Sequence, residues 1–167
     1  VDVAQLGAQV LGQWADIRSA ARKLCEDPAL WKIEGQPMAE HRERVLSQLG
    51  VLVDAGGVLL SFPESVGGKN NPGGNIANFE KLVLADPSLQ IKSGVQWGLF
   101  GAAVTHLGTD KHHKRWLPGI MSLETPGCFA MTETGHGSDV ASIATTATYD
   151  QESGDFILHT PHRGAWK

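Results

Sequence analysis

The densest group of polar residues in the sequence is the segment from Thr132 to Asp139, which reads Thr-Glu-Thr-Gly-His-Gly-Ser-Asp. Its glycines, Gly135 and Gly137, let the main chain approach a ligand closely because they carry no side chain. Its hydroxyls and successive main-chain N–H groups can donate hydrogen bonds to anionic or carbonyl oxygens. The segment therefore suits cofactor binding. A glycine-rich connection between strands is the more common origin of such a pattern, and the pattern alone does not decide.

Other kinds of site fit the same residues poorly. The two glycines begin a G-x-G-x-x-G pattern, but Val140 occupies the third glycine position and no helix signal follows, which argues against a Rossmann turn. Ser138 lacks a G-x-S-x-G context. His136, Ser138 and Asp139 are too close in sequence to converge readily as an acyl-transfer triad, so the residues disfavour a hydrolase.

A second group of potential ligands consists of His106, His112 and His113 together with Asp110. This spacing contains neither an H-E-x-x-H motif nor a matching set of cysteines, which zinc sites commonly use. We therefore expect a solvated helix face at these histidines and no metal site.

Composition limits the classes of partner. The chain has 14 basic and 18 acidic residues and a net charge of -4, which does not suggest nucleic acid or an anionic membrane surface as the main partner. No apolar run approaches the roughly 18 to 20 residues that cross a bilayer, so we expect no membrane span. The chain begins at Val1 and stops at Lys167 directly after a strand-like run, which is typical of a fragment.

The elements that carry these residues change in character along the chain. Apolar residues at steps of three and four, bounded by glycine and proline, predict five helices. Their ranges are 3–24, 42–54, 76–85, 89–107 and 110–121. The glycines, prolines and asparagines between residues 61 and 75 predict a long loop. After Pro126, short runs rich in β-branched and aromatic residues predict strands over 128–132, 145–149 and 156–159. The fold class is mainly α with a β portion too small to bury itself.

Several stretches of the sequence resemble a known family. Residues 127–138, 145–150 and 156–161 strongly resemble the acyl-CoA oxidase branch of the acyl-CoA dehydrogenase superfamily. Residues 95–101 and 107–113 are similar to the same branch, and Phe62-Pro-Glu-Ser-Val-Gly-Gly68 is similar to a motif of the whole superfamily. The resemblance implies an N-terminal helical domain, a middle β-barrel and a C-terminal helical bundle. Residues 1–126 then form the first domain, and residues 127–167 form the first strands of an incomplete barrel.

The resemblance also implies a cofactor, FAD, bound without a Rossmann fold. Thr132 matches the threonine whose hydroxyl and N–H bond the polar edge of the flavin ring, and Phe129 and Met131 match neighbours that line it. Gly137 and Ser138 match the turn that meets the FAD pyrophosphate, and Ser138 also lies near the bound substrate thioester. The catalytic base of the family is a glutamate in the bundle, so no residue of this chain is assigned a catalytic role.

The reaction implied by the resemblance converts fatty acyl-CoA to trans-2-enoyl-CoA, with oxygen or an electron-transfer protein as the acceptor. The resemblance further implies a homo-oligomer when full length, in the cytoplasm if bacterial or the peroxisome if eukaryotic. A fragment without the bundle is expected to be inactive alone. The alternative hypothesis is a non-catalytic helical interaction module, suggested by the nearly apolar helix predicted over 89–107 and the missing catalytic half.

Overall fold

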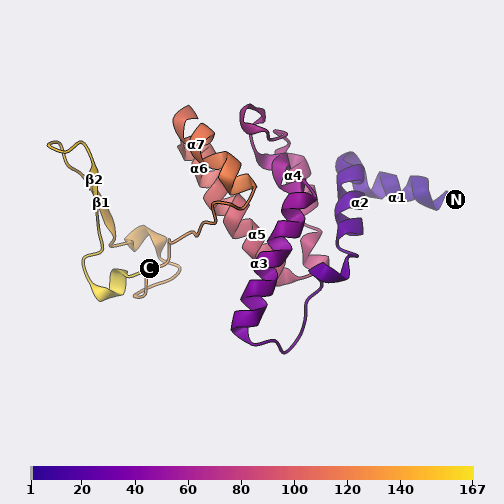
Figure 1. Ribbon diagram of the computed structural model, residues 1–167, viewed down its shortest axis with the longest axis horizontal. Coiled ribbons are helices and arrows are strands. Elements are labelled where there is room, and N and C mark those ends of the chain that lie inside the picture. Colours follow the sequence, from indigo (N-terminus) through magenta and orange to yellow (C-terminus); the bar gives the residue numbers. More distant parts are fainter. Residues whose placement is uncertain (1) are drawn as a thin grey trace. The chain divides into compact units, whose positions relative to one another are not determined.

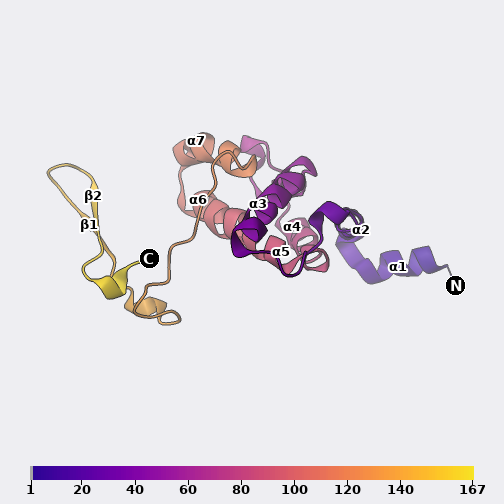
Figure 2. The same cartoon turned by 60° about the horizontal axis from the view of Figure 1, so that its bottom comes forward.

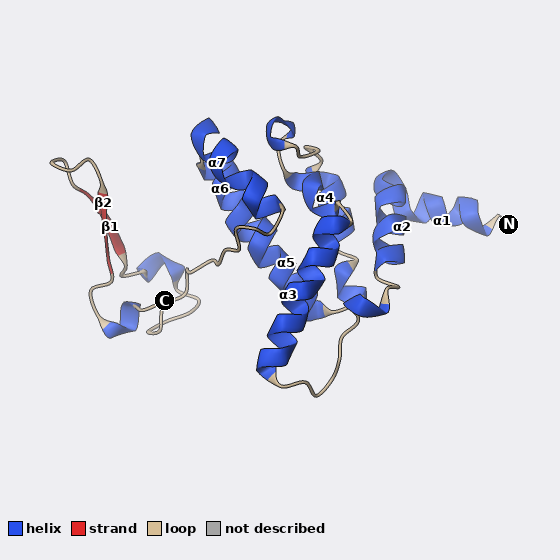
Figure 3. Ribbon diagram, in the orientation of Figure 1, coloured by secondary structure: helices blue, strands red, loops and turns tan. Residues whose placement is uncertain are grey.

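The computed structural model describes residues 2–167, which divide into two compact units (Figure 1). Unit 1 extends to Cys128, and unit 2 is Phe129–Lys167. Within the described residues, every α-helix lies in unit 1 and both β-strands lie in unit 2, where the blue coils of Figure 3 are 3₁₀ turns. The predicted order of helices followed by antiparallel strands is confirmed. The assignment of 1–126 and 127–167 to two domains of a larger enzyme stays a prediction.

The first predicted helix is interrupted. Helix α1 covers Val3–Leu11 and α2 covers Ala15–Leu24, with a 3₁₀ turn between them. The break occurs at Gly12, whose φ of 71° and ψ of -154° belong to a region that is essentially restricted to glycine. The prediction of one continuous helix is therefore wrong, because this glycine directs the chain away from the axis of α1. Helix α1 contributes no buried side chain.

Helix α3, Met38–Asp54, supplies the centre of the apolar core of unit 1. Its buried face carries Val45, Leu49 and Leu52, whose spacing places them on one side of the helix. The chain leaves the helix at Gly56, whose φ of 73° agrees with the predicted helix stop. The most deeply buried apolar side chains of this core are Leu30, Leu49, Phe62, Leu89, Leu117 and Ile120.

The long loop predicted between residues 61 and 75 is shorter than expected. Helix α4 covers Pro72–Phe79, and the side-chain oxygen of Asn71 accepts a hydrogen bond from the Gly74 N–H at 2.8 Å. Asparagine before a helix and proline in its first turn are favourable, so these residues start a helix. A β-carbon at Gly73 would overlap the indole ring of Trp14.

The nearly apolar stretch predicted as one helix consists of three consecutive helical segments. Helix α5 covers Pro87–Ser93, a π-helix covers Gly94–Gly101, and α6 covers Ala102–Leu107. Helix α7, Asp110–Met121, packs beside α6 (Figure 2) and begins with the predicted cap, Thr109. Buried side chains from α5, the π-helix and α7 belong to the same apolar core as those of α3.

Unit 2 contains a single hairpin within the described residues. Strand β1, Thr146–Tyr149, pairs antiparallel with β2, Phe156–His159, and all the strand residues are exposed. The two strands predicted here are confirmed, with β1 starting one residue later. The strand predicted over 128–132 does not form. This stretch has no partner strand among the described residues, and a strand requires a neighbour with which to exchange hydrogen bonds.

Candidate functional site

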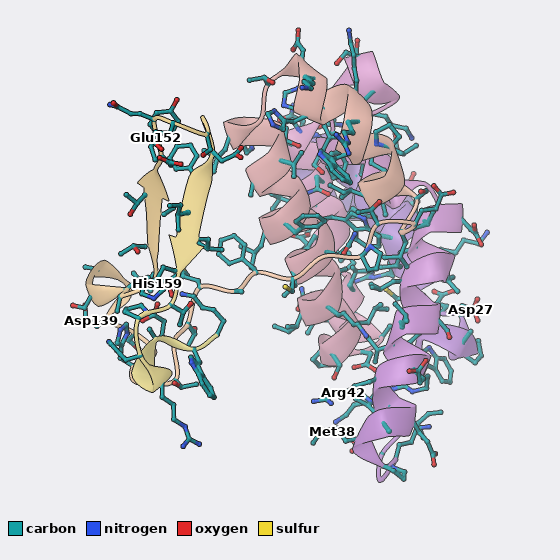
Figure 4. The ribbon with its side chains drawn as sticks, turned by 60° about the vertical axis from the view of Figure 1, so that its left-hand side comes forward. Asp27, Met38, Arg42, Asp139, Glu152 and His159 are labelled. Atoms are coloured by element: carbon teal, nitrogen blue, oxygen red, sulfur yellow. The ribbon has the colours of Figure 1, made fainter. Side chains whose placement is uncertain are left out.

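All the residues predicted to bind the cofactor lie in unit 2 and are open to solvent. They are Phe129, Met131, Thr132, Gly137 and Ser138. Phe129 and Met131 are 42% and 40% exposed, so both apolar side chains are accessible to a ligand. The predicted residues lie on both sides of a tight turn, Glu133–His136. Figure 4 labels Asp139, which follows them and precedes a 3₁₀ turn over Val140–Ser142.

The tight turn Glu133–His136 is fastened to the last residues of the unit. The Thr134 N–H donates to the carbonyl oxygen of Trp166 at 2.8 Å, and the Gly135 N–H donates to that of Gly164 at 2.7 Å. A β-carbon on Gly135 would come within 2.9 Å of the same Gly164 oxygen. Position 135 therefore requires glycine because two main-chain segments meet there.

Glu133 is buried in unit 2, with its carboxylate excluded from solvent. It accepts hydrogen bonds from the N–H groups of Ala144 and Thr145, each at 3.0 Å, and from the Thr145 hydroxyl at 2.7 Å. Lys167 Nζ donates to it at 3.0 Å. Burial raises the pKa of this carboxyl, but the hydrogen bonds to its charged form together lower the pKa to about 2. Glu133 is therefore ionised at neutral pH.

Sequence reasoning assigned no role to Glu133. Its partners lie 11, 12 and 34 residues further along the chain, so no local spacing in the sequence indicates these hydrogen bonds. A lone acidic residue among hydroxyls and glycines is typical of a solvated loop, because acidic side chains are rarely buried unless they are paired. Only the fold shows that Glu133 has these partners.

Thr132, Gly137 and Ser138 retain free hydrogen-bond donors. Across residues 2–167, no acceptor pairs with their main-chain N–H groups or with the hydroxyls of Thr132 and Ser138. A β-carbon at Gly137 would meet nothing within 4 Å, so the main chain is accessible there. Two consecutive free N–H groups and nearby hydroxyls are the donors that a diphosphate or a carbonyl edge requires. The residues present therefore fit the predicted FAD.

The hydrolase hypothesis gains no support from this geometry. His136 Nε2 lies 3.1 Å from the carbonyl oxygen of Ser142. Within the described part of the chain, the Ser138 hydroxyl forms no hydrogen bond with His136 or Asp139. A serine nucleophile requires a base within hydrogen-bond reach, and none is in place.

The histidine group organises the junction of α6 and α7. His112 accepts a hydrogen bond from the Thr109 N–H at 3.1 Å, and His113 Nε2 lies 2.9 Å from the carbonyl oxygen of Thr105. Residues 2–167 contain no group of three or more His, Cys, Asp or Glu side chains placed to hold a metal ion. Nor does any helix in this range combine the length and the apolar character needed to cross a membrane.

Residues 15–124 match the family model of the acyl-CoA dehydrogenase N-terminal domain. The chain belongs to the acyl-CoA dehydrogenase family. The matched residues lie within unit 1, so the candidate site in unit 2 lies outside the match.

Similar members of the acyl-CoA dehydrogenase family are named acyl-CoA oxidases. The chain is 42% identical over 133 residues to acyl-coenzyme A oxidase 2, peroxisomal, of Arabidopsis thaliana, covering 77% of this chain and 18% of that protein. It is 52% identical over 85 residues to an acyl-coenzyme A oxidase of Candida glabrata, covering 49% and 11%. The resemblance to the oxidase branch is confirmed.

The fold is also similar to a solved structure, an acyl-CoA oxidase from tomato (Lycopersicon esculentum). The TM-score is 0.65 at 24% identity, and the match covers 98% of this chain and 24% of that one. At this identity the match describes the fold alone. The chain spans about a fifth or less of the length of the curated relatives described above.

Proposed function

We propose that the protein to which this chain belongs oxidises fatty acyl-CoA thioesters to trans-2-enoyl-CoA, with FAD as its cofactor. Family membership and the names of the relatives support this activity. The observation that supports this activity for the present chain is the set of free donors on Thr132, Gly137 and Ser138.

In this proposal each predicted residue has a defined role. The N–H and hydroxyl of Thr132 bond the polar edge of the flavin ring, where a donor stabilises negative charge. The exposed side chains of Phe129 and Met131 line the ring. The N–H groups of Gly137 and Ser138 bind the diphosphate, and the Ser138 hydroxyl contacts the thioester of the substrate.

The reaction removes a proton from the α-carbon and a hydride from the β-carbon, and a double bond forms between the two carbons. FAD supplies the hydride acceptor when it is bound. Molecular oxygen would then accept the two electrons and the proton of that hydride, together with the proton from the α-carbon, to yield hydrogen peroxide. Glu133 is a poor candidate for the base, because its carboxylate is buried, is fully hydrogen-bonded and has a pKa of about 2. We therefore assign no catalytic residue within this chain.

Oxygen is the acceptor that we propose, because the similar proteins are named oxidases. Asp139 follows Ser138 as it commonly does in the dehydrogenases, so an electron-transfer protein is the alternative acceptor. The peroxisome is the proposed compartment, since Arabidopsis relatives are named peroxisomal, and the cytoplasm is the alternative for a bacterial source. We also propose a homo-oligomer for the full-length protein.

The test supplies octanoyl-CoA and palmitoyl-CoA to the protein encoded by the complete gene, under air and under nitrogen. We expect flavin bleaching under nitrogen, and recovery of colour with release of hydrogen peroxide under air. Bleaching that persists under air without peroxide would assign the electron-transfer alternative. A colourless protein that takes up no FAD would overturn the proposal.

A further inference from the structure

The carboxylate of Glu133 joins parts of unit 2 that are distant in sequence. Its Oε2 accepts from the Ala144 N–H at 3.0 Å, and its Oε1 accepts from both the N–H and the hydroxyl of Thr145, at 3.0 and 2.7 Å. Oε1 also accepts from Lys167 Nζ at 3.0 Å. These hydrogen bonds are charge-assisted because the carboxylate is ionised. They are weakly screened because the side chain is excluded from solvent.

Lys167 extends the network to the other side of Thr132. Its Nζ donates to the carbonyl oxygen of Met131 and to Oε1 of Glu133, both at 3.0 Å. One ammonium group therefore holds the residues immediately before and after Thr132. The free N–H and hydroxyl of Thr132 thus lie on main chain that is fixed on both sides.

Glu133 also contacts His136, the last residue of the tight turn. Glu133 and His136 exchange main-chain hydrogen bonds of 3.3 and 3.2 Å, and Gly137 and Ser138 follow directly. His136 Nε2 also lies 3.6 Å from Oε2 of Glu133. The Glu133 carboxylate is therefore linked through Lys167 to Met131, which precedes Thr132, and it lies beside His136, which precedes Gly137 and Ser138.

We propose that Glu133 is a positioning residue for the FAD-binding segment, acting through Lys167 and through the turn that it begins. This inference rests on the proposed function. Donors that are fixed before the ligand arrives bind it more tightly, because binding then does not have to order them. A donor fixed at the polar edge of the flavin also stabilises the reduced ring more strongly than a mobile one.

A positioning role and a merely structural role differ in what they change. Loss of a structural contact lowers the fraction of folded protein but leaves the properties of the flavin that is bound unaltered. Loss of positioning raises the dissociation constant of FAD in folded protein and makes the reduction potential of the bound flavin more negative, because Thr132 no longer supports the reduced ring.

The experiment uses the protein encoded by the complete gene and compares Glu133→Gln, Lys167→Met and Glu152→Gln with the wild type. Glutamine keeps the shape of the side chain but removes its charge and places an NH₂ group against donors. Lys167→Met removes the bridge while keeping an apolar stem. Glu152→Gln is the matched control, because it removes one charge from an exposed position in the hairpin turn of the same unit (Figure 4).

For Glu133→Gln we expect the FAD dissociation constant to rise about ten-fold, because binding must then order donors that Glu133 no longer fixes. The reduction potential at full FAD occupancy should become more negative. Lys167→Met should change both quantities in the same direction by a smaller factor, and Glu152→Gln should match the wild type. Circular dichroism checks the helices of unit 1 in each variant, and hydrogen exchange of the β1–β2 hairpin amides checks that unit 2 remains folded.

The outcomes separate the two proposals. A wild type that takes up no FAD overturns the proposed function and this inference with it. A yellow wild type whose Glu133→Gln variant keeps both the dissociation constant and the potential overturns the inference alone. If Glu133→Gln does not fold, Lys167→Met decides, and unchanged FAD affinity and potential in that variant overturn the positioning role.

Discussion

Unit 1 has a contiguous apolar core in addition to a buried carboxylate, Asp86, which pairs with Arg44, whereas unit 2 has a buried carboxylate, Glu133, and almost no apolar core. Fully buried Leu30, Phe62 and Leu89 belong to one contiguous core in unit 1. In unit 2, Ala165 is the only buried apolar residue among those described. Its large apolar side chains, from Tyr149 to Leu158, are more than half exposed. Apolar burial is non-directional and tolerates small shifts, while hydrogen bonds to a buried charge fix positions. Unit 1 is therefore expected to owe more of its stability to apolar burial than unit 2, in which hydrogen bonds to Glu133 fix the main chain.

The largest effect that tests this comparison is the loss of apolar volume from unit 1. Phe62 is 1% exposed, and we expect Phe62→Ala to lower the free energy of unfolding by about 3 to 5 kcal/mol, through lost burial and the cavity left behind. Denaturant unfolding followed by circular dichroism measures this change. Leu107→Ala is the control, because Leu107 is 86% exposed and its replacement should cost about 0.5 kcal/mol or less. Equal losses in the two variants would contradict the apolar core.

A smaller effect is expected from adding one methyl group to unit 2. In Gly135→Ala the new β-carbon meets the Gly164 oxygen, so the contact between the turn and residue 164 should weaken by about 1 to 3 kcal/mol. Gly137→Ala adds the same group in open space and should leave the unit intact. Hydrogen exchange of the Thr134 and Gly135 amides distinguishes them. Similar exchange in both variants would show that the turn is not tightly packed.

The smallest effect is a loss of order in unit 2 on mild acidification. The folded pKa of Glu133 is about 2, below its ordinary 4.5, so its ionised carboxylate stabilises unit 2 fully above about pH 4.5. This contribution is lost as the pH falls toward 2, and between about pH 5 and pH 3.5 only its upper part is removed. The amides of Ala144 and Thr145, corrected for intrinsic exchange, should lose protection in that window.

Glu133→Gln provides the control for the acid effect, because glutamine does not titrate. The protection of the same two amides in this variant should be lower than in the wild type at pH 5 and should change little on acidification. A loss of protection in Glu133→Gln equal to that of the wild type would assign the acid sensitivity to other carboxylates.

Much of the fold was predictable from short-range patterns. Gly56 stops α3 and Thr109 caps α7, as expected, because helix termini depend on residues within about one turn. The same patterns were wrong where a distant contact or its absence decided the outcome. Val3, Leu6 and Val10 have a helical period, yet they are 79%, 50% and 79% exposed, because no other element within residues 2–167 covers that face of α1.

In the candidate site, too, sequence reasoning found some residues and missed one that depends on distant contacts. Sequence and resemblance together predicted a binding site around Thr132 and Ser138. In the structure these two residues are exposed and have free hydrogen-bond donors. Neither located Glu133, because its burial depends on Ala144, Thr145 and Lys167 reaching it from elsewhere in the chain. The roles of Thr132 and Ser138 toward FAD stay a prediction.

Most helical segments, the order of helices before strands, the stop at Gly56 and the resemblance to the family could be read from the amino-acid sequence. Those properties arise from interactions among neighbouring residues, so they can be read without coordinates. The burial of the ionised Glu133 carboxylate in unit 2, by contrast, becomes visible in the folded chain alone. The free energy of a buried charge depends on every donor that surrounds it, and chain folding alone brings those donors together.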